Sequence, residues 1–185
     1  SGHMEAVGYD LYCKMLNEAV KSAKGIAPGE QFETSVDAKI DAFIPVNYIP
    51  NEYQKLDIYK RIAEIETKEE GEEVLEELID RFGDPPKSVT NLLLIAQLKA
   101  KAHKIFVKEV AQRGNEVKFV FYERANIDVS KIPRLVDLYK TRLKFVPDAK
   151  GPYLTLILRN NDRKDQKDDM TIMEEFLEDA AAVLL

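Results

Sequence analysis

The sequence predicts an α+β fold, in which N-terminal helices pack with a mainly antiparallel sheet built from later hairpins. Apolar residues recur at helical spacing through most of the chain up to residue 103. Beyond residue 106, apolar and polar residues alternate with period two, interrupted by turn residues. The 185 residues are 45% hydrophobic and 32% charged, a balance typical of a globular protein with a sizeable core.

Four helices are expected in the first half of the chain. They cover residues 9–23, 51–66, 67–83 and 86–103. Asn51 is a suitable N-cap for the second helix, and Pro86 suits the first turn of the fourth. Residues 26–29, with the sequence Ile-Ala-Pro-Gly, form a predicted linker.

The third helix has the clearest start and stop signals. Thr67 and Glu70 form a capping-box pattern, and Gly83 followed by Pro85 ends the helix. Its buried side is predicted from four apolar residues at helical spacing: Leu75, Leu78, Ile79 and Phe82. The side that we expect to face solvent carries Glu73, Glu77, Asp80 and Arg81.

The sheet is predicted from alternating segments. Residues 32–44 form an expected half-buried strand, and a hairpin turns at Gly114-Asn115 between strands that begin near Phe106 and end near Phe121. A short helix near Ser130 and Pro133 precedes a second hairpin, with strands at residues 143–146 and 153–158. A polar loop at residues 160–169 leads to a final helix.

Composition argues against several classes of protein. No apolar run approaches the roughly 18 residues that span a bilayer, and the N-terminus lacks the pattern of a secretory signal. Cys13 is the only cysteine, which rules out an internal disulfide and fits the reducing cytoplasm. The net charge of -6 disfavours sequence-independent binding to duplex DNA, which requires basic residues.

Motifs for catalysis or cofactor binding are missing from the sequence. It contains neither a phosphate-binding G-x-x-x-x-G-K-[ST] loop nor G-x-G-x-x-G, and neither His3 nor His103 belongs to H-E-x-x-H. We therefore expect no cofactor, no metal and no catalytic residues. A pair of carboxylates that meet in a pocket would make an enzyme, which is the third-ranked alternative.

Two charged features remain as candidate binding surfaces. Basic residues recur at Lys99, Lys101, Lys104, Lys108, Arg113 and Lys118, but they spread over several elements and fit a solvated surface better than a phosphate site. Between Glu64 and Asp84, acidic residues far outnumber Lys68 and Arg81. At the end of this acidic helix, Glu77 and Arg81 are four residues apart and Asp80 adjoins Arg81, which favours a patch of mixed charge.

Several motifs resemble the C-terminal domain of bacterial transcription-repair coupling factors. The resemblance covers residues 1–103 and continues beyond them only in length and element order. It is carried by Val7-Gly8-Tyr9, Ile44-Pro45, Tyr48-Ile49-Pro50, Tyr59-Lys60-Arg61-Ile62-Ala63 and Glu77-Leu78-Ile79-Asp80-Arg81-Phe82-Gly83.

This resemblance implies a domain boundary and a function. Residues 1–29 would be a linking helix and linker after an upstream ATP-driven motor, and residues 30–185 the C-terminal domain. In that family the domain is non-catalytic and packs against the N-terminal UvrA-binding region, which inhibits UvrA recruitment in transcription-coupled repair. The contact uses an E-L-x-D-R segment, here Glu77, Asp80 and Arg81, with Glu73 beside it. UvrA and RNA polymerase would be partners only through the full-length protein.

The second-ranked alternative is an auxiliary DNA-contacting module that uses the basic segment from Lys99 to Lys108. A salt titration with duplex DNA separates this alternative from an interaction domain, because phosphate contacts weaken steeply with salt. DNA contact and membrane contact are both less favoured than a protein partner.

Overall fold

The computed structural model describes residues 32–125, 127–159 and 167–185. Contacts divide the chain into two compact units. The described part of the first unit consists of residues 32–33 and Ile40–Ala100, and that of the second lies within Thr34–Lys39 and Lys101–Leu185. The helix expected at residues 9–23 and the linker at residues 26–29 lie outside the described residues, so the boundary at residue 29 stays a prediction.

The helices of the first unit begin and end where their local signals predict. They are α2 (Glu52–Ala63), α3 (Lys68–Phe82) and most of α4 (Lys87–Lys104), whose last residues belong to the second unit. Asn51 caps α2 by accepting a hydrogen bond from the N–H of Gln54 at 3.0 Å. Thr67 caps α3 by accepting from the N–H of Glu70 at 3.2 Å. The expected helices in this region are confirmed.

These helices enclose a core together with an irregular segment that precedes α2. The segment contributes Ala42, Ile44 and Ile49, all of which are buried against the helices. The hydroxyl oxygen of Tyr59 accepts a hydrogen bond from the backbone N–H of Ile44 at 3.0 Å, which satisfies a buried donor outside regular structure. The helices contribute Ile58, Ile62, Val74, Leu78, Val89, Leu92, Leu93 and Ala96.

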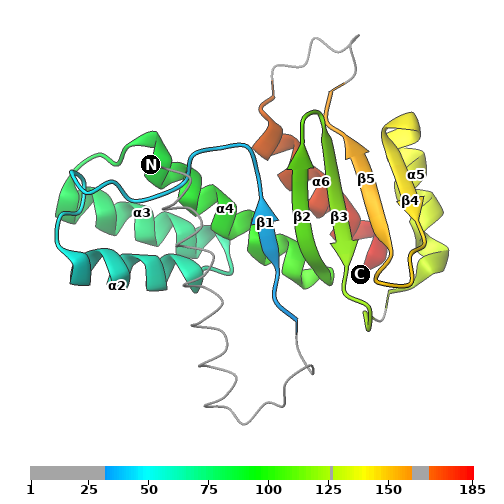
Figure 1. Ribbon diagram of the computed structural model, residues 1–185, viewed down its shortest axis with the longest axis horizontal. Helices are drawn as coiled ribbons and strands as arrows, with labels where there is room; N and C mark the ends of the chain where they lie inside the picture. The colour runs from blue at the N-terminus through cyan, green and yellow to red at the C-terminus, as the bar shows by residue number, and fades with distance from the viewer. Residues whose placement is uncertain (1–31, 126, 160–166) are drawn as a thin grey trace. The chain divides into compact units, whose positions relative to one another are not determined.

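The second unit contains one five-stranded sheet (Figure 1). Its strands are β1 (Ser35–Asp37), β2 (Val107–Arg113), β3 (Glu116–Phe121), β4 (Leu143–Val146) and β5 (Tyr153–Ile157). They are ordered β1-β2-β3-β5-β4, with β1 parallel to β2 and the other neighbours antiparallel. Helices α5 (Ile132–Tyr139) and α6 (Asp169–Leu184) complete the unit, so the α+β class is confirmed.

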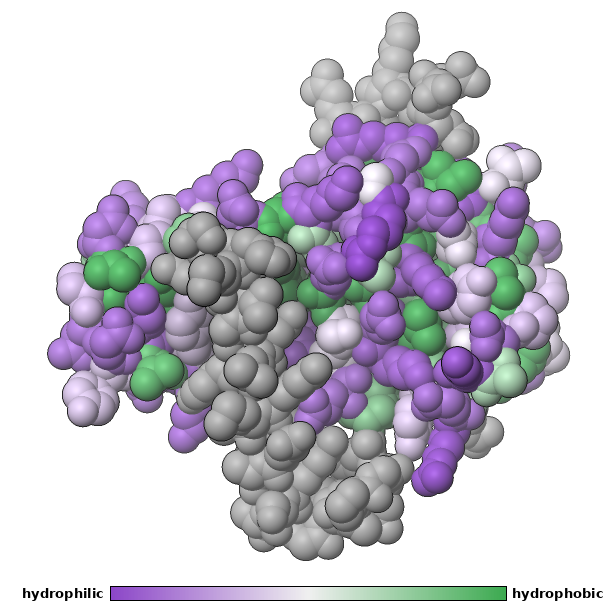
Figure 2. All heavy atoms as spheres, in the orientation of Figure 1, coloured by the Kyte–Doolittle hydropathy of each residue, from purple (hydrophilic) through white to green (hydrophobic). Residues whose placement is uncertain are grey.

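Helix α6 covers one face of this sheet. The rings of Phe119 on β3 and Phe176 on α6 have centroids 4.6 Å apart, and Tyr139 of α5 meets the edge of Phe176 at 5.3 Å. Phe119 and Phe176 are fully buried. The opposite face of the sheet is turned towards the viewer in Figures 1 and 2, where hydrophilic side chains predominate over it.

One strand is much shorter than the sequence suggested. Residues 32–44 were expected to form a single strand, but only Ser35–Asp37 pairs with β2. The burial alternation nevertheless continues to Ala42 and Ile44, because these two side chains enter the helical core of the first unit. The expected loop at residues 160–169 also ends earlier, since Asp168 caps α6 and Asp169 is its first residue.

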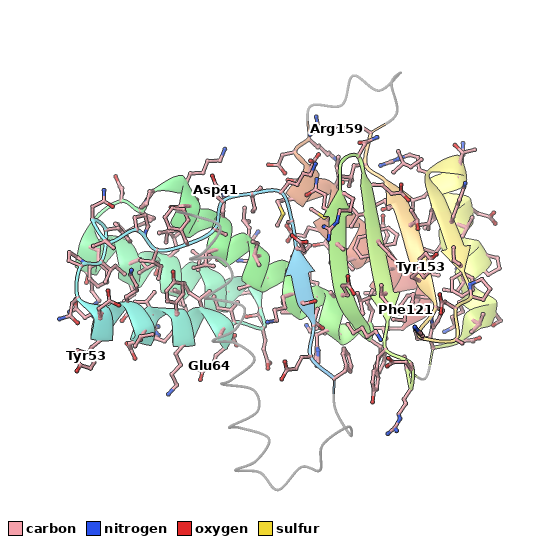
Figure 3. The ribbon with its side chains drawn as sticks, in the orientation of Figure 1. Asp41, Tyr53, Glu64, Phe121, Tyr153 and Arg159 are labelled. Atoms are coloured by element: carbon pink, nitrogen blue, oxygen red, sulfur yellow. The ribbon has the colours of Figure 1, made fainter. Side chains whose placement is uncertain are left out.

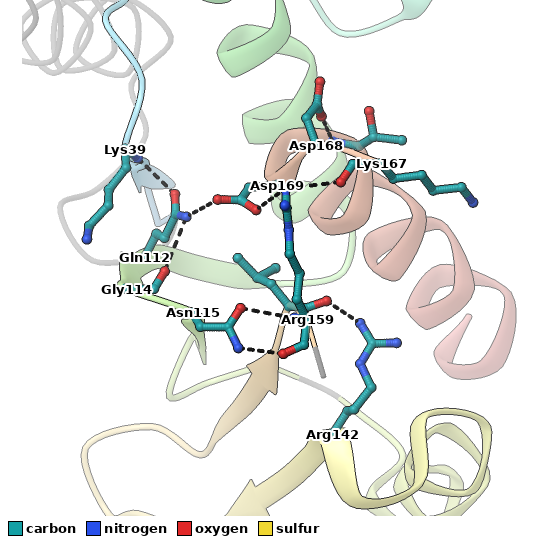
Figure 4. Close-up of polar contacts among 11 residues, drawn as sticks. Lys39, Gln112, Gly114, Asn115, Arg142, Arg159, Lys167, Asp168 and Asp169 are labelled. Atoms are coloured by element: carbon teal, nitrogen blue, oxygen red, sulfur yellow. Dashed lines mark hydrogen bonds and ion pairs between the residues drawn. The ribbon is translucent and has the colours of Figure 1, made fainter. Parts of the chain in front are cut away.

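A buried polar side chain links three segments at one end of the sheet (Figure 4). Gln112 on β2 is only 3% exposed. Its Oε1 accepts from the N–H of Lys39 at 2.8 Å, and its Nε2 donates to Oδ2 of Asp169 at 2.8 Å. Gln112 therefore links strand β2 both to the segment that follows β1 and to the start of helix α6.

None of the helices in the described part of the chain combines the length and the apolar character needed to cross a bilayer.

Candidate protein-interaction site

Helix α3 presents the four charged residues expected to face solvent. They are Glu73, Glu77, Asp80 and Arg81, which we call the α3 ridge. Glu73, Asp80 and Arg81 are exposed, and Glu77 is half-buried. Their spacing of four, three and one residues places them on one side of the helix. The ridge therefore offers both an acid and a base to a partner.

The carboxylate of Glu77 is paired with two neighbouring arginine side chains. It forms ion pairs with Arg61 of α2 and with Arg81 one turn further along α3, the latter at 3.5 Å between Oε1 and Nη1. The side chains of Glu77, Arg61 and Arg81 remain 33%, 37% and 34% exposed. Glu77 thus ties α2 to α3 and orients Arg81, while Glu73 and Asp80 point to solvent.

The end of α3 is held by a residue that the sequence analysis did not single out for this role. The hydroxyl of Tyr48 donates to the carbonyl of Gly83 at 2.8 Å and lies 3.3 Å from that of Leu78. Burial and, to a lesser extent, the charge of Asp84 raise the pKa of Tyr48. The tyrosine ring also packs at 5.9 Å from that of Phe82. The guanidinium of Arg81 in turn lies 4.9 Å from the centre of the Phe82 ring. These contacts hold the end of the helix that carries the ridge in place.

The buried side of α3 differs in one position from the predicted one. Leu78 is fully buried, and Leu75 and Phe82 are partly buried, but Ile79 is 43% exposed. Val74 takes its place in the core, and Gly71 lies against Gln97 of α4. The side-chain amide of Gln97 lies over Gly71, where an added Cβ would be 2.3 Å from Nε2, so the buried side of α3 includes Gly71 and Val74. Ile79 consequently lies beside Asp80 at the surface.

In the basic segment from Lys99 to Lys108, two of the four lysines are paired with carboxylates. Lys101 donates to Glu174 at 2.5 Å and to Glu178 at 2.6 Å, and Lys108 pairs with Glu123. Burial alone would lower the pKa of Lys101, but the hydrogen bonds and charges of Glu174 and Glu178 outweigh this effect and raise the pKa. Lys99 is half-buried and Lys104 is exposed. This pairing reduces the positive charge with which the segment could displace counterions from DNA.

No group of three or more potential metal ligands occurs among the described histidine, cysteine, aspartate and glutamate side chains. The hydroxyl of Thr34 is 3.1 Å from Nδ1 of His103. Hydrogen bonds from Lys108 and Ser130 lower the pKa values of Glu123 and Asp128, respectively. A lowered pKa keeps these carboxylates ionised, unlike a general acid. Cys13 lies outside the described residues.

Two residues that support the ridge could have been found from sequence only as members of longer motifs. Tyr48 belongs to Tyr-Ile-Pro, and Arg61 to Tyr-Lys-Arg-Ile-Ala, both of which carried the family resemblance. Their contacts with α3 depend on how the segment before α2 and α2 itself pack, which no local pattern specifies.

Comparison with known proteins gives a consistent result. A family model described as TRCF domain matches residues 38–132, which include the whole α3 ridge. The transcription-repair-coupling factor of Bacillus subtilis (strain 168) is 35% identical over 181 residues, which are 96% of this chain and 15% of that protein. That of Staphylococcus aureus (strain NCTC 8325 / PS 47) is 37% identical over 131 residues, 69% of this chain and 11% of that protein.

A solved structure resembles the chain in fold as well as in sequence. The crystal structure of the C-terminal domain of a transcription-repair coupling factor superimposes with a TM-score of 0.64 at 26% identity. The match covers 80% of this chain and 93% of the other. The chain thus spans about one seventh or less of the length of the curated relatives named above, and nearly all of the solved domain.

Proposed function

Because the chain belongs to the transcription-repair coupling factor family, we propose that it is the non-catalytic regulatory domain of such a factor. In this proposal the domain packs through the α3 ridge against the N-terminal UvrA-binding region of the same protein. It thereby inhibits UvrA recruitment until the protein is remodelled at a stalled RNA polymerase in the bacterial cytoplasm. UvrA and RNA polymerase are partners of the full-length protein.

The exposure of Asp80 and Arg81 at the anchored end of α3 is the observation that carries this proposal. An acid and a base side by side can pair with charges of both signs on a partner, which fixes orientation. The ordered end of the helix reduces the entropy lost on docking. Glu73 extends the same side by two turns.

A contact within one polypeptide also suits a polar surface. A tethered partner is present at high effective concentration, so a weak interface can remain closed in the resting protein. The same interface opens when the upstream motor pulls its two sides apart. A large apolar contact would resist this opening more strongly.

The test uses the full-length factor that carries this domain. The variant Glu73→Arg/Asp80→Arg/Arg81→Glu changes the net charge by two units, and Glu72→Arg on the same helix changes it equally outside the ridge. We expect the ridge variant to bind UvrA more tightly and the control to behave as wild type. Glu77 is left intact because it also pairs with Arg61.

Direct binding gives a second readout. The 185-residue chain should bind the separately produced N-terminal UvrA-binding region, and the ridge variant should bind it more weakly, with the circular dichroism of both forms alike. Equal affinity of wild type and ridge variant for that region, together with unchanged UvrA binding, would exclude the proposed contact.

A further inference from the structure

The sheet of the second unit has one face that no helix of this unit covers within the described residues. Helix α6 packs on the face that carries Phe119, as the contact with Phe176 shows. The other face is turned towards the viewer in Figure 1, with α6 behind the strands. Side chains alternate along a strand, so Lys118 and Val120 of β3 lie on this uncovered face.

Strand register brings two lysines onto one row of the uncovered face. Lys118 on β3 is opposite Thr155 on β5, which is opposite Lys144 on the edge strand β4. Adjacent strands are about 4.8 Å apart, so the two lysine Cα atoms are separated by about 10 Å. Both lysines are exposed, and Thr155 is half-buried between them. We call Lys118, Thr155 and Lys144 the lysine row.

Half-buried apolar residues adjoin the lysine row. Tyr153 on β5, labelled in Figure 3, is opposite Val146 on β4. Both residues are one pleat away from Thr155 and Lys144 on the same face. Ile157 lies on the other side of Thr155. Each of these three residues is half-buried. The amino group of Lys118 lies 4.1 Å from the centre of the Tyr153 ring, so the ring is flanked by charge.

The lysine row also differs from four other basic residues of the second unit. Lys101, Lys108, Arg113 and Arg159 each pair with a carboxylate. Within residues 32–125, 127–159 and 167–185, neither Lys118 nor Lys144 forms an ion pair with an acidic side chain. Glu116 points to the same face at the turn end of β3, between Arg113 on β2 and Ile157 on β5.

We propose that the lysine row, with Tyr153, Val146 and Ile157, is a docking surface for an acidic segment of a partner protein in which carboxylates alternate with apolar side chains. Its lysines lie across half-buried apolar side chains, the arrangement of a protein interface with charged groups around apolar ones. Carboxylates of the segment pair with Lys118 and Lys144. Apolar side chains between them cover Tyr153 and its neighbours.

A nucleic acid fits this surface less well. The chain has a net charge of -6, which repels a polyanion, whereas a short acidic segment brings apolar side chains that bury surface here. The surface is also separate from the α3 ridge, which belongs to the first unit. Substitutions in the lysine row therefore leave the contact proposed for the α3 ridge testable, and substitutions in the ridge leave the lysine row testable.

The test measures fluorescence anisotropy with three probes and the 185-residue chain. The first is a short labelled peptide in which glutamate alternates with phenylalanine and leucine. The second has glutamine in place of each glutamate, and the third is labelled oligothymidylate. We expect only the glutamate peptide to bind. The variant Lys118→Glu/Lys144→Glu should weaken its binding about tenfold or more, because like charges then face each other.

Two further variants separate charge from folding and from net charge. Lys118→Gln/Lys144→Gln removes the attraction without repulsion and should give an intermediate loss. Lys39→Glu/Lys104→Glu, at two exposed lysines of the same unit outside the row, should leave binding unchanged. Equal binding of the glutamate and glutamine peptides, wild-type affinity of the glutamate-substituted row, or tighter binding of oligothymidylate through the row would each overturn the proposal.

Discussion

The hydroxyl of Tyr48 and the carbonyl of Gly83 are joined by a hydrogen bond of 2.8 Å across the end of helix α3. Tyr48 lies in the irregular segment before α2, and Gly83 ends α3 with a φ of 85°. The last carbonyls of a helix have no partner within it, so an external donor at this place stabilises the helix end. The hydrogen bond therefore anchors the end of the helix that carries the α3 ridge.

Removing the anchor should weaken the first unit. We expect Tyr48→Phe to lower the free energy of unfolding by about 1 kcal/mol, the usual contribution of one such hydrogen bond. Urea denaturation followed by circular dichroism measures the change. Tyr53→Phe is the matched control, because Tyr53 is 85% exposed on α2. Equal denaturation midpoints for the two variants would show that the bond contributes nothing.

The ion pairs of Glu77 should contribute modestly to stability. Because the three side chains are about one-third exposed, we expect Glu77→Gln to cost less than about 1 kcal/mol. The loss should shrink in concentrated salt, which screens the charges. Glu76→Gln, at a more exposed position of α3, serves as the control in the same urea titrations. A loss from Glu77→Gln that is unaffected by salt would argue for a packing defect rather than lost ion pairs.

Gly151 should tolerate substitution less well than Gly114, the glycine in the turn between β2 and β3. Its φ is 122°, and an added Cβ would lie 2.6 Å from the carbonyl oxygen of Phe121. Gly114 has a φ of 63° and no atom within 4 Å of such a Cβ. Gly114→Ala should therefore cost about 1 to 2 kcal/mol from backbone strain alone. Gly151→Ala should cost clearly more, as measured by thermal unfolding, and equal losses would contradict the steric argument.

Tyr139 should make the second unit sensitive to alkaline pH. Burial, followed by its 2.5 Å hydrogen bond to Asp179 and the charge of Asp179, raises the pKa of Tyr139 well above that of a free tyrosine. The folded state thus favours the neutral phenol. This contribution is fully present below pH of about 10, the pKa in an unfolded chain, and is lost as pH rises towards the higher folded value.

The variant Tyr139→Phe isolates this effect. It should be less stable than wild type at neutral pH, and its free energy of unfolding should fall less steeply above pH of about 10. Lys101, whose pKa is also raised, leaves part of the alkaline slope in both proteins. Urea titrations across alkaline pH measure both slopes. Parallel slopes would mean that the phenol does not titrate differently on folding.

Local signals were sufficient for some elements. Helix α3 begins after Thr67 and ends before Gly83, as predicted. Capping and a positive φ are properties of a few adjacent residues, so they can be recognised from a short stretch of sequence. The edge strand β4 also begins and ends at the expected residues, Leu143 and Val146. The turn at Gly114-Asn115 joins β2 and β3. In each case the deciding interactions lie within a short stretch of sequence.

Other features depend on partners distant in the chain. The alternation from Val36 to Ile44 is the same whether a side chain faces a sheet or a helical core, so it could not reveal where β1 ends. Ile79 is exposed because the buried side of α3 is centred on Gly71, Val74 and Leu78, which the helical spacing alone did not specify. The pairing of Glu77 with Arg61 likewise requires α2 to lie beside α3. The α3 ridge was thus located from sequence, while its supporting contacts were not.

The parallel pairing of β1 with β2 has a consequence for how the nascent chain acquires its structure. On the ribosome, Ser35–Asp37 emerges before all of α2, α3 and α4, whereas its neighbour β2 emerges after them. The antiparallel strands β2, β3, β4 and β5 follow one another closely and can assemble without it. We expect the addition of β1 to be the late step, because closing so long a loop carries the largest entropy cost in the sheet.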